Sequence, residues 1–196
     1  MNYHNRVLGA TALCVAALAV RGSAAPATST LAPALANPAG LEFTLKLSGG
    51  KTSFMQGETI PVTLAFSNTG PQRLWLNQFS GLKSFEVEPK EGVTNLFGGL
   101  PAPTAVFIAG YVPPPVRLSE KPTEERCSLN EYLRFDRPGT YTIRATTSSV
   151  FALPEGAAPP RIGLFPSAKP FISTSTPTSI QIVPADPQWQ QQQVEA

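Results

Sequence analysis

The chain has 196 residues, including 21 prolines and 15 glycines, and only 14% of its residues are charged. Proline ends helices and glycine weakens them, so this composition argues against a helical bundle and favours an all-β domain with many turns. The 15 basic and 13 acidic side chains give a formal net charge of +2, too balanced for the basic face that nucleic-acid binding requires.

The N-terminal residues have the pattern of a secretory signal peptide. A basic start precedes fourteen apolar-leaning residues, a run short for a membrane span, and small residues follow. Gly22 and Ala24 form a small-residue pair, so we predict a signal peptide at 1–24 with cleavage near Ala24. A lipid anchor at Cys14 is the alternative, although bulky Leu13 precedes it where a small residue is expected. The prediction is a secreted or periplasmic protein with no membrane contact in its mature form.

Loss of the signal peptide would remove several reactive groups. Arg6 and Arg21 would leave with it, so the mature chain would have 13 basic and 13 acidic residues. The single histidine, His4, would also leave, and Cys127 would have no partner for an intrachain disulfide. Nucleophilic triads need an imidazole to take the proton, and zinc sites draw on several histidines or cysteines. We therefore expect no cofactor, no metal and no enzymatic activity.

The remaining sequence divides into three parts. Residues 25–40, APATSTLAPALANPAG, are uncharged and rich in alanine and proline, as expected of a flexible linker. A β-sandwich domain is predicted over 41–184. A tail over 185–196 follows, in which Asp186-Pro187 is a typical helix start.

Short strands follow one another along the predicted domain, with no amphipathic helix between them. LEFTLKL (41–47) is the clearest strand, because four apolar residues alternate with polar ones. The other expected strands are a short one around Phe54, then Ile60 to Phe66, Leu74 to Leu76, 84–89, Ala105 to Tyr111, Leu129 to Phe135, Thr140 to Val150 and Thr178 to Val183. About seven to nine strands of this kind predict an all-β, immunoglobulin-like β-sandwich.

The stretch LRFDRPGTYTIRA contains a sharp turn between two of these strands. Pro138 fixes φ near −65° and Gly139 permits a positive φ, so the chain reverses there and Phe135 and Tyr141 face one core. In immunoglobulin-like domains a tyrosine at this place returns its hydroxyl to the backbone of the preceding corner. We expect Tyr141 to make this bond, with an ordinary turn followed by a core tyrosine as the alternative.

Three apolar residues stand where immunoglobulin domains have a disulfide and a buried tryptophan. Leu64 and Ile143 occupy the places of the two cysteines, and Trp75 occupies that of the tryptophan. We expect these three side chains to pack together in a core without a disulfide.

Two longer stretches are similar to one group of secreted bacterial modules. FMQGETIPVTLAFSNTGPQRLWLNQF and LNEYLRFDRPGTYTIRA contain an aromatic-x-x-Gly-Glu turn before a strand, a closing Asn-Thr-Gly, and a Pro-Gly-x-Tyr corner. The sequence thereby resembles immunoglobulin-like modules of the macroglobulin-domain and BsuPI proteinase-inhibitor type, over roughly residues 41–150. The resemblance implies an exported β-sandwich and supplies no catalytic residues. It also implies a likeness to the N-terminal part of longer bacterial proteins that continue into helices.

Residues 151–172, FALPEGAAPPRIGLFPSAKPFI, are predicted to form a long loop between the last two strands. Hairpin loops are usually two to five residues long, and longer loops in compact domains are often functional. The loop between the second and third strands emerges at the same end of such a sandwich, so SNTGPQR (67–73) is expected beside it. The alternative is a segment that folds back over a sheet edge. The candidate residues for contact with another protein are Phe151, Leu153, Arg161, Ile162, Leu164, Phe165 and Lys169.

These features predict an exported, non-catalytic binding or scaffold module that contacts a protein partner through this loop. A proteinase inhibitor that uses the same loop is the second hypothesis. A carboxylate-dependent hydrolase is the third, and it would use Glu86 with Glu88, or Glu124 with Glu125. We expect these carboxylates to lie on solvated faces, because no aromatic or asparagine cluster that could hold a sugar accompanies them. Cys127 is expected to be a half-buried, unreactive residue near a strand start.

Overall fold

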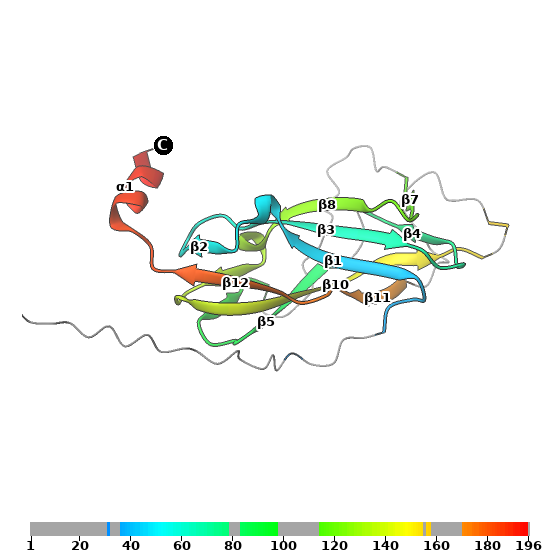
Figure 1. The fold of residues 1–196 in the computed structure, drawn as a ribbon, viewed down its shortest axis with the longest axis horizontal. Coiled ribbons are helices and arrows are strands. Elements are labelled where there is room, and N and C mark those ends of the chain that lie inside the picture. The colour runs from blue at the N-terminus through cyan, green and yellow to red at the C-terminus, as the bar shows by residue number, and fades with distance from the viewer. Residues whose placement is uncertain are drawn as a thin grey trace, which may run out of the picture.

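The chain folds into β-strands arranged in several sheets, with a short helix near its C-terminus (Figure 1). The computed structural model describes Leu31 and residues 36–78, 83–97, 114–154, 156–157 and 170–195. The strands are β1 (Leu41–Leu47), β2 (Ser53–Met55), β3 (Pro61–Asn68), β4 (Leu74–Leu76), β5 (Lys83–Glu88), β6 (Val93–Asn95), β7 (Val116–Arg117), β8 (Thr123–Ser128), β9 (Leu133–Phe135), β10 (Gly139–Ala152), β11 (Pro170–Thr174) and β12 (Thr178–Val183). Two 3₁₀ turns, Ser48–Gly50 and Leu129–Glu131, and helix α1 (Pro187–Glu195) complete the described elements. The prediction of an all-β fold is confirmed.

One layer is a three-stranded antiparallel sheet in the order β1-β3-β8. The buried and exposed side chains of β1 alternate, because apolar residues at every second position face the same side of a strand. The central strand β3 has a neighbour on each side, and all its residues after Pro61 are buried. Pro61 has no N–H to donate, and its place at the first position of the strand is one that a sheet tolerates.

The second layer is built around β10, which has 14 residues. Its first part pairs with β12 along one edge and with β5 along the other. Its last part pairs with β11 and β4, and the register with β11 shifts between Thr147 and Val150. β2 extends this sheet beside β12, and β7 extends it beside β4.

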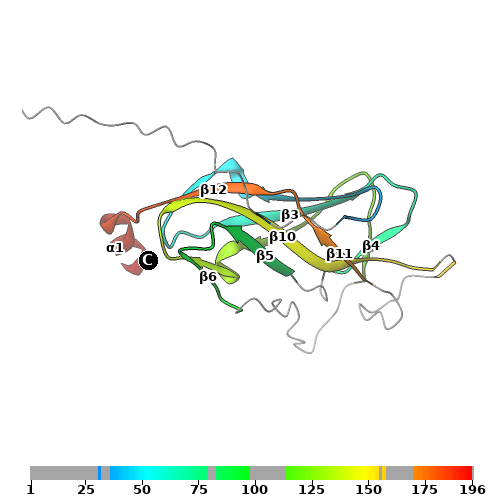
Figure 2. The ribbon, with the colours of Figure 1, turned by 90° about the horizontal axis from the view of Figure 1, so that it is seen from below.

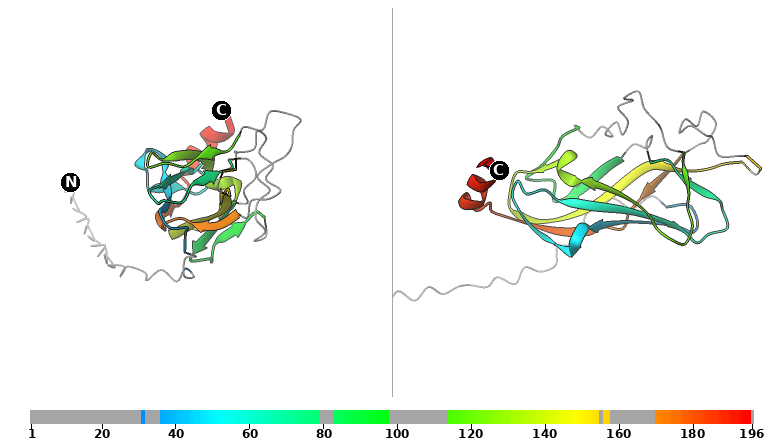
Figure 3. Two further views of the ribbon diagram at one scale, coloured as in Figure 1. Left: turned by 90° about the vertical axis from the view of Figure 1, so that its right-hand side faces the viewer. Right: turned by 90° about the horizontal axis from the view of Figure 1, so that it is seen from above.

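The hydrophobic core lies between the two layers, which the left panel of Figure 3 shows from one end. Apolar side chains from both sheets form this core, and the rings of Phe43 and Phe66 stack with their centroids 4.4 Å apart. A small antiparallel pair, β6 with β9, lies beside the second layer. Helix α1 and the strands β4 and β7 lie at opposite ends of the molecule (Figure 1).

The expected bond at the Asp-Arg-Pro-Gly corner is present. The Tyr141 hydroxyl donates to the carbonyl oxygen of Arg137 at 2.8 Å, and the Tyr141 ring lies 5.1 Å from that of Phe135. Burial raises the pKa of the Tyr141 phenol. The expectation of a positive φ at Gly139 is wrong, because Gly139 lies in β10 and is not among the glycines with positive φ. The reversal therefore takes place before Gly139, between Phe135 and the start of β10.

Four of the five predicted core residues are buried as expected. Leu64 and Ile143 are both 0% exposed, and Phe135 and Tyr141 belong to the same cluster. The prediction for Trp75 is wrong, because its side chain is only half-buried. Strand β4 turns its two leucines, Leu74 and Leu76, into the core, and the residue between them must point to the opposite face.

Strand β8 was not expected from the sequence, and the predicted solvated face at Glu124 and Glu125 is wrong for Glu125. Both residues lie in β8, and Glu125 is only 9% exposed because it points toward the other layer. The predicted strand from Leu129 to Phe135 is also wrong in its first half, which forms the 3₁₀ turn. Ser128 starts that turn, since its Oγ accepts a hydrogen bond from the backbone N–H of Asn130.

The predicted helix start in the tail is confirmed. The backbone N–H of Gln188 donates to the Asp186 carboxylate at 2.8 Å, which caps the first turn of α1. The predicted signal peptide at 1–24 and the predicted strand from Ala105 to Tyr111 lie outside the described residues. The predicted linker 25–40 is described only at Leu31 and 36–40.

Candidate functional site

The structure describes the two ends of the predicted contact loop at 151–172. β10 continues to Ala152, so Phe151 is a strand residue, 3% exposed, and pairs across the sheet with Trp75. The expectation that Phe151 is a contact residue is therefore wrong, because β10 is longer than the alternating pattern indicated. Leu153 is half-buried, just after the strand. The other candidates lie outside the described residues: Arg161, Ile162, Leu164, Phe165 and Lys169.

Strand register fixes the end of the molecule from which this loop leaves. Ala152 is paired with Leu74, so the chain after β10 and the chain before β4 emerge at the same end. SNTGPQR (67–73) precedes β4 and therefore lies at this end, as the sequence predicts. We call the surface formed by 68–73 and 117–121 the loop end.

A cavity of about 510 Å³ is present at the loop end, between these two segments. Hydrogen bonds of Asn68 stabilise the two segments that form the walls of this cavity. The Asn68 side chain donates to the carbonyl oxygen of Gln72 at 2.7 Å and accepts from the N–H of Gly70 at 3.1 Å. Its backbone N–H donates to the carbonyl oxygen of Ser119 at 2.8 Å, which joins the two segments. The cavity is therefore built by backbone turns with fixed geometry.

The rim of this cavity is mostly cationic. Arg73, Arg117 and Lys121 line it and are exposed, while Glu120 is the acidic residue among the lining side chains. Charges on a concave surface attract ligands of opposite sign and speed their encounter. The loop end is suited to contact with an acidic surface.

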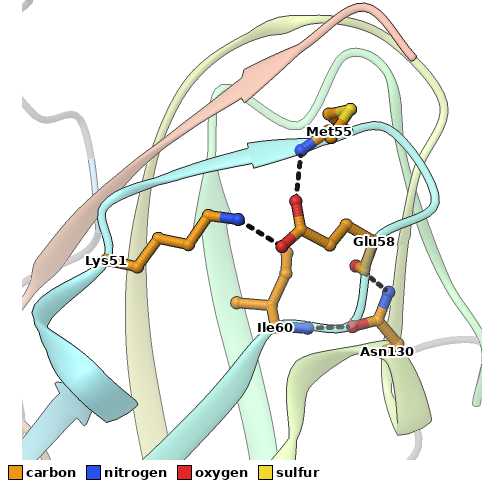
Figure 4. A network of polar contacts seen from close by, with 5 residues as sticks. All are labelled: Lys51, Met55, Glu58, Ile60 and Asn130. Atoms are coloured by element: carbon orange, nitrogen blue, oxygen red, sulfur yellow. Dashed lines mark hydrogen bonds and ion pairs between the residues drawn. The ribbon is translucent and has the colours of Figure 1, made fainter. Parts of the chain in front are cut away.

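A network of hydrogen bonds stabilises the turn between β2 and β3, at the end of the molecule opposite the loop end (Figure 4). The Glu58 carboxylate accepts hydrogen bonds from Lys51 and from the backbone N–H of Met55, the latter at 2.9 Å. Asn130 accepts from the N–H of Ile60 at 2.7 Å and donates to the carbonyl oxygen of Glu58 at 3.1 Å. Burial opposes ionisation of Glu58, but the two donors outweigh it and lower the pKa of this carboxyl. The arrangement is suited to holding a turn.

A buried ion pair joins the two layers. Lys83 of β5 lies 2.8 Å from Glu125 of β8, and their side chains are 11% and 8% exposed. Burial raises the pKa of Glu125, and the nearby Lys83 opposes that rise. Burial also raises the pKa of Cys127 to about 11, so its thiol is protonated at neutral pH. Cys127 is half-buried, as expected, but lies near the end of β8.

The other predicted carboxylate pair, Glu86 and Glu88, lies on β5. Glu86 forms an ion pair with Arg144 of β10, with 3.6 Å between Oε2 and Nη1. Both glutamates line a groove along β5, together with Lys90. Among the residues that the structure describes, no three histidine, cysteine or acidic side chains are grouped to hold a metal ion.

The chain matches no protein-family profile and no curated protein. A solved structure of AvmM, described as catalysing macrocyclization in alchivemycin A biosynthesis, is similar over 74% of this chain and 92% of that chain, with 15% identity and a TM-score of 0.29. A likeness at this TM-score supports no conclusion about the fold or activity of this chain. No helix within the described ranges has the length and apolarity needed to cross a membrane.

Proposed function

We propose that this chain is an exported, non-catalytic binding module that contacts another protein through its loop end. The observation that supports this function best is the 510 Å³ cavity with its cationic rim, at the end where β10 leads into the long segment before β11. A rigid sheet that presents loops at one end is the usual way in which β-domains offer a binding surface.

The proposed fold is an immunoglobulin-like β-sandwich without a disulfide. Two facing sheets and the bond from Tyr141 to the backbone of the preceding corner support it. Leu64 and Ile143, at the places of the two cysteines, are fully buried in one core. The departure from the pattern is at Trp75, since Leu74 and Leu76 supply the core contacts of that strand.

Export rests on the predicted signal peptide at 1–24. We expect the protein isolated from its source to begin at Ala25 and to be found in the periplasm or outside the cell. N-terminal sequencing and intact mass measurement test this expectation. A purified native chain that begins at Met1 would contradict the proposed export.

The binding function is tested by affinity capture from the exported proteins of the source. Wild type is compared with Arg73→Glu/Arg117→Glu at the loop end, and with a variant that lacks 158–167. The matched control is Lys46→Glu/Arg126→Glu, which reverses two exposed charges on β1 and β8. We expect recovery of one partner to fall at least about tenfold with both loop-end variants and to be unchanged with the control. An equal loss with the control, or no loss with the loop-end variants, would refute a partner site at this end.

A proteinase inhibitor is the second candidate, and one observation favours it. The segment between β10 and β11 begins and ends at paired strands, since Phe151 lies opposite Pro170. Its two ends are thus held side by side, as the ends of a loop that enters a protease cleft must be. Incubation with serine, cysteine and metalloproteases tests this role. An inhibitor is expected to block one of them while its loop remains uncut, and rapid cleavage within 158–167 without inhibition would exclude it.

A further inference from the structure

A groove of about 430 Å³ follows one edge of β5. Five consecutive residues of this strand, Ser84–Glu88, line it together with Val93 and Asn95 of β6 and Leu133 of β9. Neighbouring residues of a strand point to opposite faces of the sheet. A cavity that all five residues line must therefore run along the edge of the strand, since a cavity over one face would meet only every second residue.

This edge of β5 has no strand partner within the described part of the chain. The opposite edge is paired with β10 over the whole length of β5, and β10 separates β5 from β12 (Figure 2). An unpaired edge exposes backbone donors and acceptors, and natural proteins cover such edges to avoid unwanted pairing. Phe85 and Val87 give the groove an apolar floor, since they are 5% and 6% exposed. The groove is suited to an extended, apolar segment.

The chain that precedes β1 touches the second layer at two points. The half-buried Leu31 lines the groove along β5. Asn37 binds β11, because its Nδ2 donates to the carbonyl oxygen of Thr174 and its Oδ1 accepts from the N–H of Thr174, both at 2.9 Å. These two bonds reproduce the pair that a neighbouring strand would make with Thr174. Since β5 and β11 pair with opposite edges of β10, Leu31 and Asn37 lie on either side of that strand.

A glycine contact fixes the path of the chain between Asn37 and β1. A Cβ atom on Gly70 would lie only 2.4 Å from the carbonyl oxygen of Ala39, so this close approach requires glycine. Gly40, with φ of +83°, turns the chain into β1 at the same place. Residues 36–40 are therefore an ordered part of the domain.

The outer face of β10 is covered near Arg144. The neighbours of Arg144 in sequence, Ile143 and Ala145, point into the core, so Arg144 must point out of the opposite face. Arg144 is nevertheless only 6% exposed, whereas the side chain of its ion-pair partner Glu86 is 48% exposed. A buried arginine on an outer face needs a covering segment, and the contacts of Leu31 and Asn37 lie on either side of this position.

We propose that residues 25–36 bind to the second layer within the same chain, with Leu31 as the apolar anchor in the groove along β5 and Asn37 as the fixed end on the other side of β10. The segment APATSTLAPALA has no charge, which matches the apolar floor of the groove. Its prolines favour an extended backbone, so little conformational entropy is lost when the segment lies along a strand. This inference does not depend on the function proposed for the loop end.

Hydrogen exchange of the β5 amides tests this proposal in the intact protein. Wild type is compared with Leu31→Asp, which places a charge against the apolar floor, and with Leu31→Met, a conservative control. We expect the amides of 83–88 that face the groove to exchange about tenfold faster in Leu31→Asp and at the wild-type rate in Leu31→Met, while the amides bonded to β10 stay protected in both. Exchange in β3 should be the same in all three proteins, which verifies that the domain remains folded.

A synthetic peptide of residues 25–36 supplies the second measurement. Added to the Leu31→Asp protein, it should restore slow exchange in β5, and the same peptide with aspartate in place of Leu31 should not. Unchanged β5 exchange in Leu31→Asp would overturn the proposal, as would a peptide that gives no protection. Wild-type protection that depends on protein concentration would also overturn it, because the segment would then bind a neighbouring copy.

Discussion

The stability of the end opposite the loop end should depend on Asn130. In Asn130→Ala the N–H of Ile60 loses its 2.7 Å acceptor and the carbonyl oxygen of Glu58 loses its 3.1 Å donor. The contact of the asparagine Oδ1 with the Ser128 hydroxyl at 3.2 Å is lost as well. Ile60 is 1% exposed, so water has little access to replace the lost acceptor.

The expected cost follows from these three interactions. A typical hydrogen bond contributes about 1 kcal/mol, and a buried group left without a partner costs about 1–3 kcal/mol. Asn130→Ala should therefore lower the free energy of unfolding by about 2–4 kcal/mol, which corresponds to a fall in Tm of roughly 5–15 °C for a chain of this size. Unfolding in urea, followed by near-ultraviolet circular dichroism, measures the change.

Asn95→Ala is the matched control. The Asn95 side chain accepts one exposed hydrogen bond, from the N–H of Phe97 at 2.9 Å, and we expect its removal to cost less than about 1 kcal/mol. A loss below about 1 kcal/mol for Asn130→Ala, or equal losses for the two variants, would refute the assignment of Asn130 as the residue that fastens this turn.

Four further predictions concern the core. Tyr141→Phe should cost about 1 kcal/mol in urea unfolding, because it removes the bond to Arg137 but keeps the ring in place, and an unchanged stability would contradict that role. At pH 8 Cys127 should react with a maleimide at least about a hundredfold more slowly than an unhindered thiol, and the reaction rate should rise toward pH 11. Fast labelling of Cys127 in the folded protein would be inconsistent with the burial of its thiol. Lys83→Met should cost about 3–5 kcal/mol at pH 7, since it leaves the Glu125 carboxylate buried without its cation. The raised pKa of Glu125 means that the folded chain holds the carboxyl proton more tightly than the unfolded chain. The stability that this difference contributes is therefore complete below pH 4.5 and is lost as the pH rises through the folded pKa. Measured against Glu125→Gln, wild-type stability should fall over that range, and a rise would show that the sign is wrong.

Local patterns predicted much of the fold. β1 begins and ends where its alternating apolar residues do, because one of its faces is buried and the other is exposed to solvent. The corner before β10 was also predictable, since Pro138 and Tyr141 lie close together in sequence and their chemistry is local. The helix start at Asp186 followed from the same kind of short-range rule.

Features that depend on contacts distant in sequence were not predictable. β8 turns Glu125 toward the core, and only its pairing with Lys83, some forty residues away, explains why a carboxylate is buried there. In Leu74-Trp75-Leu76 all three side chains are apolar, so the sequence does not indicate which face of β4 is buried. The cavity at the loop end could not be located either, because 117–121 reaches Asn68 through a backbone bond that leaves no sequence pattern.

The long sequence separation between β5 and β10 governs when the second sheet can assemble. Among the described strands, β5 has β10 as its sole pairing partner, and that partner begins 51 residues after β5 ends, at Gly139. During synthesis β5 can therefore pair only after the residues up to about 150 have been translated. Until then the nascent chain has no complete second layer to close over its apolar side chains, so the two layers close only after β10 has been translated.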